Sequence, residues 1–496
     1  MPAAPDSHTP ASPHPDPTGP RGSLSARALD RRILALAVPA LGALIAEPLF
    51  VLIDSAMVGH LGATSLAGLS LASSLLTTVV GLFVFLAYAT TATTARLFGA
   101  GDRVGGLRAG IDGLWLAALL GAAAATLLWT LAPWVTHTLG ADDEVARASV
   151  AYLRASAPGL PGMLLVFAAT GTLRGLLDTR TPFLVATVGA GLNAGLNAIL
   201  LYVVGMGVAG SGLGTAITQS LMAVALALPV LHAARADGVS VAPRRAGLMT
   251  ALGTGTPLLV RTITLRVAVL ATVWAATALG DVPLAAHQVV TSLWSFIAFT
   301  LDALAIAAQA LIGTALGQAD AARQAPETDV EAGEAGDRLT EAEPSDAQPV
   351  LPIDTVLRRS LVWGVGASAL IGVLVASLSP WLPLMFSSDP QVVAATTPAL
   401  VVAAVSLPIA GAVFLFDGVL MGAGDGVYLA KAGIMTLVPY LPLTVAIHAG
   451  WPETGSLGLV WLWAAFAWVF MGARLVTTGL RDRKSTRLNS SHVKLS

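Results

Sequence analysis

The chain has no cysteine and very few charges. None of its 496 residues is Cys, so disulfides, thiolate metal sites and cysteine nucleophiles are excluded. Charged residues make up 11% and hydrophobic residues 55%, with a mean hydropathy of +0.76, which is too apolar for an ordinary soluble globular protein. A net charge of -2 supplies no basic surface for nucleic-acid phosphates, so we expect no nucleic-acid partner. The predicted class is an integral membrane protein.

Catalytic and metal motifs are also missing. The sequence contains no H-E-x-x-H and no G-x-S-x-G, and its eight histidines show no ligand spacing. A membrane-embedded enzyme is therefore only an alternative, and His287 is expected to be a hydrogen-bonding residue at the outer end of a span. We predict no metal and no cofactor.

The second half of the chain repeats the first. A shift of 218 residues carries Pro39, Gly62, Gly99 and Asp102 onto Pro257, Gly280, Gly317 and Asp320, and a shift of 247 carries Gly171 and Asp178 onto Gly418 and Asp425. Such a spacing far exceeds solenoid periods. The additional 29 residues of the second shift coincide with the polar stretch 324–352. The sequence thus predicts a duplicated membrane body interrupted by a linker.

Twelve apolar runs are long enough to span a bilayer, which takes roughly 20 residues of helix. They lie near residues 33–57, 65–90, 109–135, 146–172, 183–205, 208–232, 248–279, 283–312, 357–386, 393–420, 427–449 and 455–480. Six spans per repeat make the two copies parallel. The predicted fold is an all-α membrane protein of twelve transmembrane helices, in two six-helix lobes related by a pseudo-two-fold axis.

Basic residues occur on every second connection between these spans. They include Arg31, Arg96, Arg103, Arg174, Arg180, Arg244, Arg358, Lys431 and Arg481, whereas the alternate connections carry Asp142, Asp143, Glu144, Asp281, Asp389 and Glu453. By the positive-inside rule both termini are predicted to be cytoplasmic. The expected location is the cytoplasmic (inner) membrane of a bacterium, with the chain as a monomer.

These patterns predict six segments. Residues 1–30 form a disordered cytoplasmic tail and not a cleaved signal, because they lack an apolar core. The N-lobe is 31–235, and the C-lobe is 236–320 and 353–483. Residues 321–352 are an acidic cytoplasmic linker, for which a solvated tether is favoured over a regulatory role. Residues 484–496 hold two of the three lysines and resemble appended, non-native or disordered sequence.

The first span carries two carboxylates, Glu47 and Asp54, seven residues apart on one helical face. An ionisable group deep in a span costs roughly 2.5–3.5 kcal/mol, so it needs a cavity, a partner or a function. Pro48 lies between them and is a candidate hinge. Desolvation penalises the ion, so Asp54 could hold a proton in one state and release it when water enters. The alternative is that Asp54 caps the outer end of the span.

Other polar groups mark further candidate sites. Asn193 and Asn197, four apart on the fifth span, line the N-lobe cavity near Asp54 or bond neighbouring helices. In the second half, a C-lobe polar site comprises Asp302, Gln309, Asp417, Arg261 and Arg266, in which a structural Arg–Asp bridge and a ligand site stay as alternatives. Asp178 and Asp425 follow glycine-rich turns and are expected to cap loops or act as a latch.

Four strings together resemble the multidrug and toxic compound extrusion (MATE) transporters, and among them the DNA-damage-inducible F-like (DinF-like) branch. They are EPLFVLIDSAMVGHLGATSLA from Glu47, AAHQ from Ala285, LDALAIAAQALIGTALG from Leu301 and FDGVLMGAGD from Phe416. The resemblance covers residues 30–480. It implies two lobes around a central cavity, which alternate between outward-open and inward-open states while cations enter as substrate leaves.

The resemblance assigns the family's first-span aspartate to Asp54 and its fifth-span asparagine to Asn197. Many relatives carry a second aspartate four residues later, where this chain has Leu201, so coupling through Asp54, alone or with Glu47, is expected. Protons fit this site better than Na+, which wants more hard oxygen ligands. The expected cargo is an amphipathic, often cationic small molecule. Phe167, Phe296, Phe299 and Phe414 are candidate lining residues, although positions facing lipid or the helix core are favoured for these aromatics. A lipid or lipid-linked oligosaccharide flippase is the alternative, although only Arg261 and Arg266 are candidates to hold a pyrophosphate.

Overall fold

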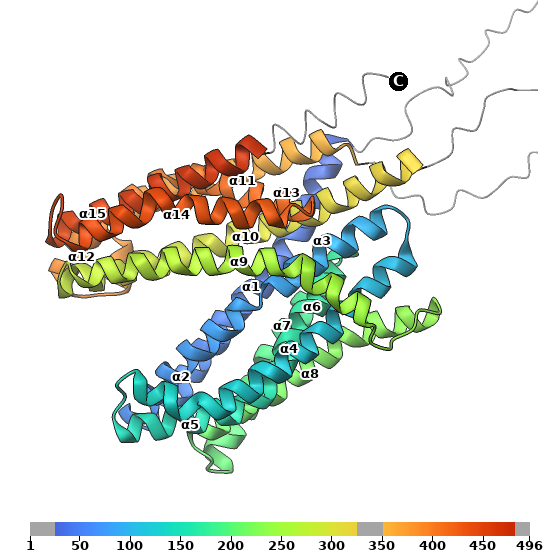
Figure 1. The fold of residues 1–496 in the computed structure, drawn as a ribbon. Helices are drawn as coiled ribbons and strands as arrows, with labels where there is room; N and C mark the ends of the chain where they lie inside the picture. Colours follow the sequence, from blue (N-terminus) through green and yellow to red (C-terminus); the bar gives the residue numbers. More distant parts are fainter. Residues whose placement is uncertain (1–24, 325–350, 482–496) are drawn as a thin grey trace, which may run out of the picture.

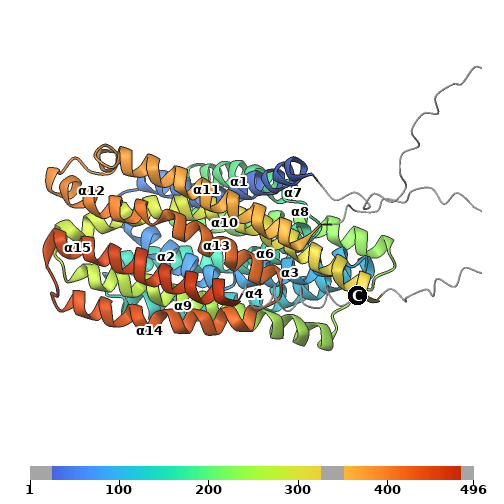
Figure 2. The ribbon, with the colours of Figure 1, turned by 90° about the horizontal axis from the view of Figure 1, so that it is seen from above.

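A computed structural model describes residues 25–324 and 351–481. Most of the predicted tail 1–30 and linker 321–352, and all of the predicted C-terminal stretch 484–496, lie outside the described residues. Within the described part, residues 26–30 of the predicted tail belong to α1 and residues 321–324 of the predicted linker belong to α10. The described chain is helical, and its long helices form two bundles that diverge from each other in Figure 1 and overlap in the view of Figure 2.

The first half of the chain contains the helices α1 (Ala26–Gly59), α2 (Ala63–Leu82), α3 (Phe85–Gly99), α4 (Arg103–Thr138), α5 (Asp143–Ser156), α6 (Leu160–Gly175), α7 (Arg180–Ala198) and α8 (Val208–Ala236). The second half contains α9 (Arg245–Thr277), α10 (Asp281–Gln324), α11 (Ile353–Leu378), α12 (Pro390–Val405), α13 (Leu407–Gly422), α14 (Gly426–His448) and α15 (Gly455–Ala464). A π-helical stretch, Ala465–Phe470, continues the last span to Arg481.

Eleven described segments are long and apolar enough to cross a membrane, and the bent pair α12–α13 brings the number to twelve. The predicted twelve-span fold is therefore confirmed. Some boundaries differ from the prediction. The second span is broken into α2 and α3, and α10 continues twelve residues past the predicted end at 312. Hydropathy does not detect that extension, because its residues include Gln318, Asp320 and Arg323.

Two spans are broken at equivalent places. The fourth span is interrupted between α5 and α6 by the 3₁₀ turn Ala157–Gly159, and Pro161 stands in the first turn of α6. The tenth span bends by 51° between α12 and α13, where Pro408 stands in the first turn of α13. Proline has no N–H to donate to the preceding turn, so the helix is interrupted there. A shift of 247 residues carries Pro161 onto Pro408.

The repeat is visible in the packing. A Cβ on Gly171 would lie 2.6 Å from the carbonyl oxygen of Ala87, and one on Gly418 would lie 2.4 Å from that of Ala305. The shift of 218 residues carries Ala87 onto Ala305, and the shift of 247 carries Gly171 onto Gly418, so the two contacts are equivalent in the repeat. Both glycines thus allow a six-helix lobe to pack its second and fourth spans at backbone contact.

The N-lobe comprises α2–α8 and the second part of α1, and the C-lobe comprises α10–α15 and the second part of α9. The first parts of α1 and α9 each pack on the opposite lobe. Leu29 and Ile33 of α1 lie in a buried cluster with Leu311 and Val356, whereas Ala46, further along, packs with N-lobe residues. Conversely, Leu258 of α9 lies in the N-lobe core. Each helix crosses between lobes near one of the repeat-related prolines, Pro39 and Pro257.

The lobes meet where α3 packs against α9, α10 and α13. We call this the junction end; α1 begins there and α10 and the last helix end there, whereas the lobes diverge toward α2, α5, α12 and α15 at the far end (Figure 1). The contact is at backbone distance, because a Cβ on Gly99 would lie 2.2 Å from the Thr314 carbonyl oxygen and one on Gly317 would lie 2.0 Å from that of Arg96.

These two junction contacts are related to each other by the repeat. A shift of 218 residues carries Gly99 onto Gly317 and Arg96 onto Thr314. The seam between α3 and α10 therefore lies on the pseudo-two-fold axis. At its end the Arg96 guanidinium forms an ion pair of 2.7 Å with Asp320, which joins the two lobes.

Candidate functional site

Asp54 is buried in the N-lobe and receives hydrogen bonds from two side chains of other helices. Its side chain lies on α1 with 5% of the residue exposed. Asn197 Nδ2, on α7, donates to Asp54 Oδ1, and the Tyr152 hydroxyl, on α5, donates to Asp54 Oδ2 at 3.3 Å. Asn197 Nδ2 also lies 3.2 Å from Asn193 Oδ1. The structure thus brings together Asp54, Asn193 and Asn197.

Tyr152 was not singled out in the sequence. It is 3% exposed and lies two turns into α5. A lone tyrosine in an apolar span gives no periodic signal, so the sequence does not show that it faces α1. Asn193 extends the network to α8, because its Nδ2 donates to Thr215 Oγ1 at 3.3 Å. Four helices therefore hold the carboxylate in place.

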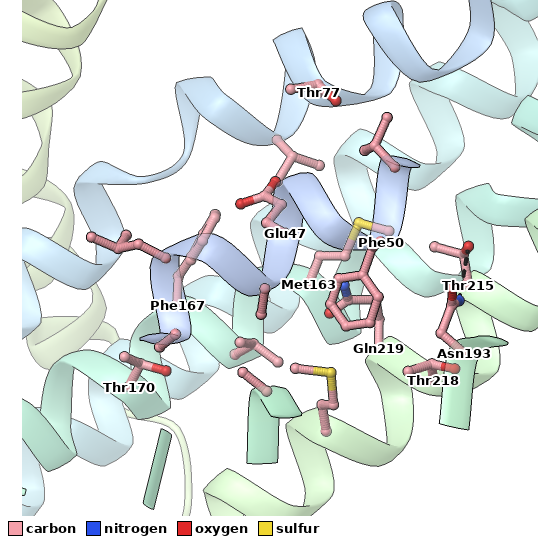
Figure 3. A pocket seen from close by; sticks show the side chains of 18 of the residues that line it. Glu47, Phe50, Thr77, Met163, Phe167, Thr170, Asn193, Thr215, Thr218 and Gln219 are labelled. Carbon is pink, nitrogen blue, oxygen red and sulfur yellow. Dashed lines mark hydrogen bonds between the residues drawn. The ribbon is translucent and has the colours of Figure 1, made fainter. Parts of the chain in front are cut away.

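A cavity of about 160 Å³ adjoins this network (Figure 3). Its wall includes Asp54, Glu47 and Asn193, together with apolar side chains such as Phe50 and Phe167. Figure 3 shows Glu47 and Phe50 projecting from α1 among residues of the neighbouring N-lobe helices. The cavity therefore combines an apolar wall with two carboxylates.

Glu47 is exposed within this cavity and is not sealed in the helix packing. Its carboxylate interacts electrostatically with Arg266 of α9. Arg266 itself lies against α2, since a Cβ on Gly81 would be 2.5 Å from Arg266 Nη2. Pro48 lies inside α1, which the structure keeps continuous from Ala26 to Gly59.

Asp417 is the centre of a buried ion cluster in the C-lobe. Its Oδ2 accepts hydrogen bonds from Arg261 Nη2 and from Arg474 Nη2, each at 2.5 Å, and the residue is 3% exposed. Arg474 was not among the predicted residues, because an arginine close to the end of the last span is expected to reach the interface. Here it is 6% exposed and lies over Phe470.

The remaining members of the predicted C-lobe polar site are spread apart. Gln309 Nε2 donates to the Tyr88 carbonyl oxygen at 2.7 Å, across the junction of the lobes. Asp302 interacts electrostatically with Arg261, but among the described residues it forms no hydrogen bond or ion pair. Arg266 lies near Glu47 and not at Asp417. The five predicted residues therefore do not form one site.

The stability of the protein is expected to depend on the buried ion cluster of Asp417 with Arg261 and Arg474. Replacing Asp417 with alanine leaves two buried guanidinium groups without their carboxylate, which is expected to reduce stability by about 3–5 kcal/mol. The measurement is the thermal unfolding of the purified protein in detergent. Asp425→Ala is the control, because the Asp425–Arg481 pair has side chains 23% and 40% exposed and such pairs contribute about 0–1 kcal/mol. Equal shifts in the two variants would contradict a structural role for the buried cluster.

The two repeat-related aspartates have different contacts. Asp178 Oδ1 accepts from the backbone N–H groups of Arg180 and Thr181, at 2.9 and 3.0 Å, and so satisfies the first turn of α7. Asp425 instead receives Arg481 Nε at 2.7 Å. Asp178 thus stabilises a helix start, and Asp425 joins α14 to the end of the last span.

The predicted aromatic lining residues also differ in position. Phe167 lines the N-lobe cavity. Phe296 is exposed on α10, and the Arg474 guanidinium lies 5.8 Å from the ring centre of Phe414. Among the described residues no group of three or more Asp, Glu or His side chains is placed to hold a metal ion.

Known proteins resemble this chain over about two thirds of its length or more. It is 29% identical to the chloroplastic protein DETOXIFICATION 44 of Arabidopsis thaliana over 471 residues, which cover 90% of this chain and 81% of the relative. It is 28% identical to DETOXIFICATION 42 of the same plant over 66% of this chain and 57% of that protein.

Solved structures share the fold. One is a multidrug resistance MATE transporter of the MOP superfamily in an outward-facing conformation, with a TM-score of 0.77, 19% identity and coverage of 93% of this chain and 97% of the other. Another is a MOP-superfamily transporter from Pyrococcus furiosus described as having a binding pocket of reversed polarity, with a TM-score of 0.77, 20% identity and the same coverage.

The sequence profile of one family covers most of the chain. It is described as MatE and matches residues 39–199, 257–326 and 351–445, which include α1 beyond Pro39 and the α3–α10 seam. This match confirms the expectation of a membrane transporter over that of an enzyme. The chain is a multi-pass membrane protein that belongs to the MatE family of transporters.

Proposed function

We propose that the protein is a proton-coupled antiporter that exports lipophilic, often cationic, small molecules by alternating access. The observation that carries this proposal is the buried Asp54 carboxylate, held by Asn197 and Tyr152 at the edge of an apolar cavity. A carboxylate in such a place can bind one proton and lose it when the cavity becomes wet. The similarity of the described strings supports placing the chain in the DinF-like branch.

Protonation of Asp54 is the step that couples proton entry to cargo release in the proposed transport cycle. Cargo enters the cavity from the cytoplasm or the inner leaflet, and the lobes open outward. A proton then neutralises Asp54, which weakens the hydrogen bond from Asn197, allows α1 to repack at Pro48 and releases the cargo. For a cargo without net charge, one proton that enters down 100 mV supplies about 2.3 kcal/mol, enough to concentrate cargo outside by roughly fiftyfold. Exchange of one proton for a monovalent cation moves no net charge, so the pH difference supplies the drive in that case.

The proposed location is the cytoplasmic (inner) membrane of a bacterium, with the chain as a monomer and both termini in the cytoplasm. Arg96, Arg103 and Arg244 are at the junction end, as are the basic ends of α6 and of the last helix. Positive charge of this kind favours the cytoplasmic side. The junction end is then the inner side, and contact between α3 and α10 there corresponds to an outward-facing state.

The test is transport by purified protein in proteoliposomes that contain a lipophilic cationic dye. A pH gradient and a sodium gradient are imposed in separate experiments. We expect dye movement with the pH gradient and none with the sodium gradient alone. Movement driven by sodium alone would contradict proton coupling, and no movement with either gradient would contradict antiport.

A further inference from the structure

Arg174 is a buried cation in the wall of the N-lobe cavity. The sequence pattern placed it in a basic connection, but it lies in the last turn of α6 with 7% of the residue exposed. It lines the same cavity as Glu47 and Asp54. The cavity is therefore bordered by charges of both signs.

The other buried arginines of the described chain have oxygen partners. Arg108 donates to the carbonyl oxygens of Ser240 and Ala242, and Arg261 and Arg474 donate to Asp417. The Arg174 guanidinium forms no hydrogen bond or ion pair with any described residue, and it interacts with Asp302 and Tyr88 only electrostatically. A guanidinium has five N–H donors, and the nitrogens of Arg174 are not among the fully enclosed polar atoms without a partner, so they reach the open space beside the cavity wall.

The cavity wall extends along α6 as far as Arg174. Met163 and Arg174 both line it from α6, and eleven residues of helix correspond to about 16 Å. In Figure 3 Thr170, one turn before Arg174, lies at the opposite side of the view from Asn193 and Thr215, and Glu47 lies between them. Apolar side chains, among them Phe167, fill the wall between these polar groups.

We propose that Arg174 binds the carboxylate of a zwitterionic cargo whose cationic group lies near Glu47. The inference rests on the proposed export function and names a cargo class for it. A guanidinium can hold a carboxylate through two parallel N–H···O bonds, which gives orientation as well as affinity. The apolar wall then contacts the hydrophobic body of the same molecule. Arg174 acts as a specificity residue, because a cargo without an acid group loses these two bonds.

The experiment uses a zwitterionic rhodamine with a free carboxylic acid, and its methyl ester, which is a cation without the acid. Binding of both dyes to the full-length protein in nanodiscs is measured by fluorescence anisotropy. Arg174→Gln is expected to weaken binding of the acid at least tenfold and binding of the ester less than twofold. Arg174→Lys keeps the charge but not the planar fork, so it is expected to recover part of the lost affinity for the acid.

Asp302→Asn separates cargo binding from a purely structural role. Removing the carboxylate that interacts with Arg174 makes the site more positive, so the acid is expected to bind as tightly as before or more tightly. Weaker acid binding in Asp302→Asn, comparable to that in Arg174→Gln, would show that the pair stabilises the lobe contact and would overturn the inference. Thermal unfolding in detergent checks that each variant is folded.

Three further results would overturn the inference. They are equal losses for the two dyes in Arg174→Gln, no loss for the acid, and a native protein that fails to bind the acid. Each leaves the export function intact if a pH gradient still drives the cationic ester across proteoliposomes. Conversely, selective acid binding without such transport would contradict the export function alone.

Discussion

Replacing Asp54 with asparagine is expected to abolish proton-driven efflux while leaving dye binding within a few-fold of its original strength. The carboxamide has the shape of the protonated acid but exchanges no proton, so the cavity no longer responds to the gradient. Asn197 Nδ2 and the Tyr152 hydroxyl both donate to the Asp54 carboxylate. In the variant these two donors lose their charged acceptor, whereas the packing around residue 54 is kept. The measurement is dye uptake into inverted vesicles after an imposed pH jump, compared with dye binding in detergent.

Two further variants make this result interpretable. Glu453→Gln removes an exposed carboxylate from the loop before α15 and is expected to transport normally. Glu47→Gln tests whether the second carboxylate of α1 shares the proton, and a coupling loss equal to that of Asp54→Asn would show that it does. Full proton-driven efflux by Asp54→Asn would refute the assignment of Asp54.

Gly317→Leu is expected to disfavour closure of the junction end and to reduce efflux by about 5- to 150-fold. Even a Cβ at this position would lie 2.0 Å from the Arg96 carbonyl oxygen, which belongs to backbone and cannot rotate away. Overpacking of this kind costs about 1–3 kcal/mol. A two-state equilibrium between closed and open junction ends shifts by about 5- to 150-fold for that energy.

The absence of cysteine makes the conformational change measurable. Spin labels on Val104→Cys and Gln324→Cys would report the separation of the two lobes at the junction end by pulsed electron paramagnetic resonance. Gly317→Leu is expected to add a population with a longer separation. Gly366→Leu is the matched control, because a Cβ on that helical glycine meets nothing within 4 Å. Unchanged distances in Gly317→Leu would show that the contact between α3 and α10 adjusts locally without separating the lobes, which would contradict the prediction.

The sequence predicted the number of spans and the internal repeat better than the contacts between side chains of different spans. Pro39 and Pro257, or Gly99 and Gly317, mark the repeat because proline and glycine are identifiable residue types at a constant spacing. The proximity of Asp54 to Asn197 was expected from the face they occupy and from family resemblance. Neither source shows which residues of distant spans meet, since helix rotation and span bends decide that.

Arginine positions show this limit most clearly. Hydropathy and charge rules assign arginines near span ends to the interface, and Arg174 and Arg474 lie near span ends. In the structure both are buried, one in the cavity wall and one on Asp417. Their long side chains reach back along the helix, so sequence position does not locate the charge.

The crossing of α1 has a consequence for how the chain is assembled. Leu29 and Ile33 pack on residues of α10 and α11, and Leu36 shares their cluster with Val419 of α13. A ribosome completes α1, which ends at Gly59, before it has made any of these partners, the last of which is Val419. The N-lobe therefore enters the membrane while the first turns of α1 still lack the C-lobe helices on which they pack. The order of synthesis thus differs from the order of packing. Folding of the N-lobe is complete only when the second half of the chain has been inserted.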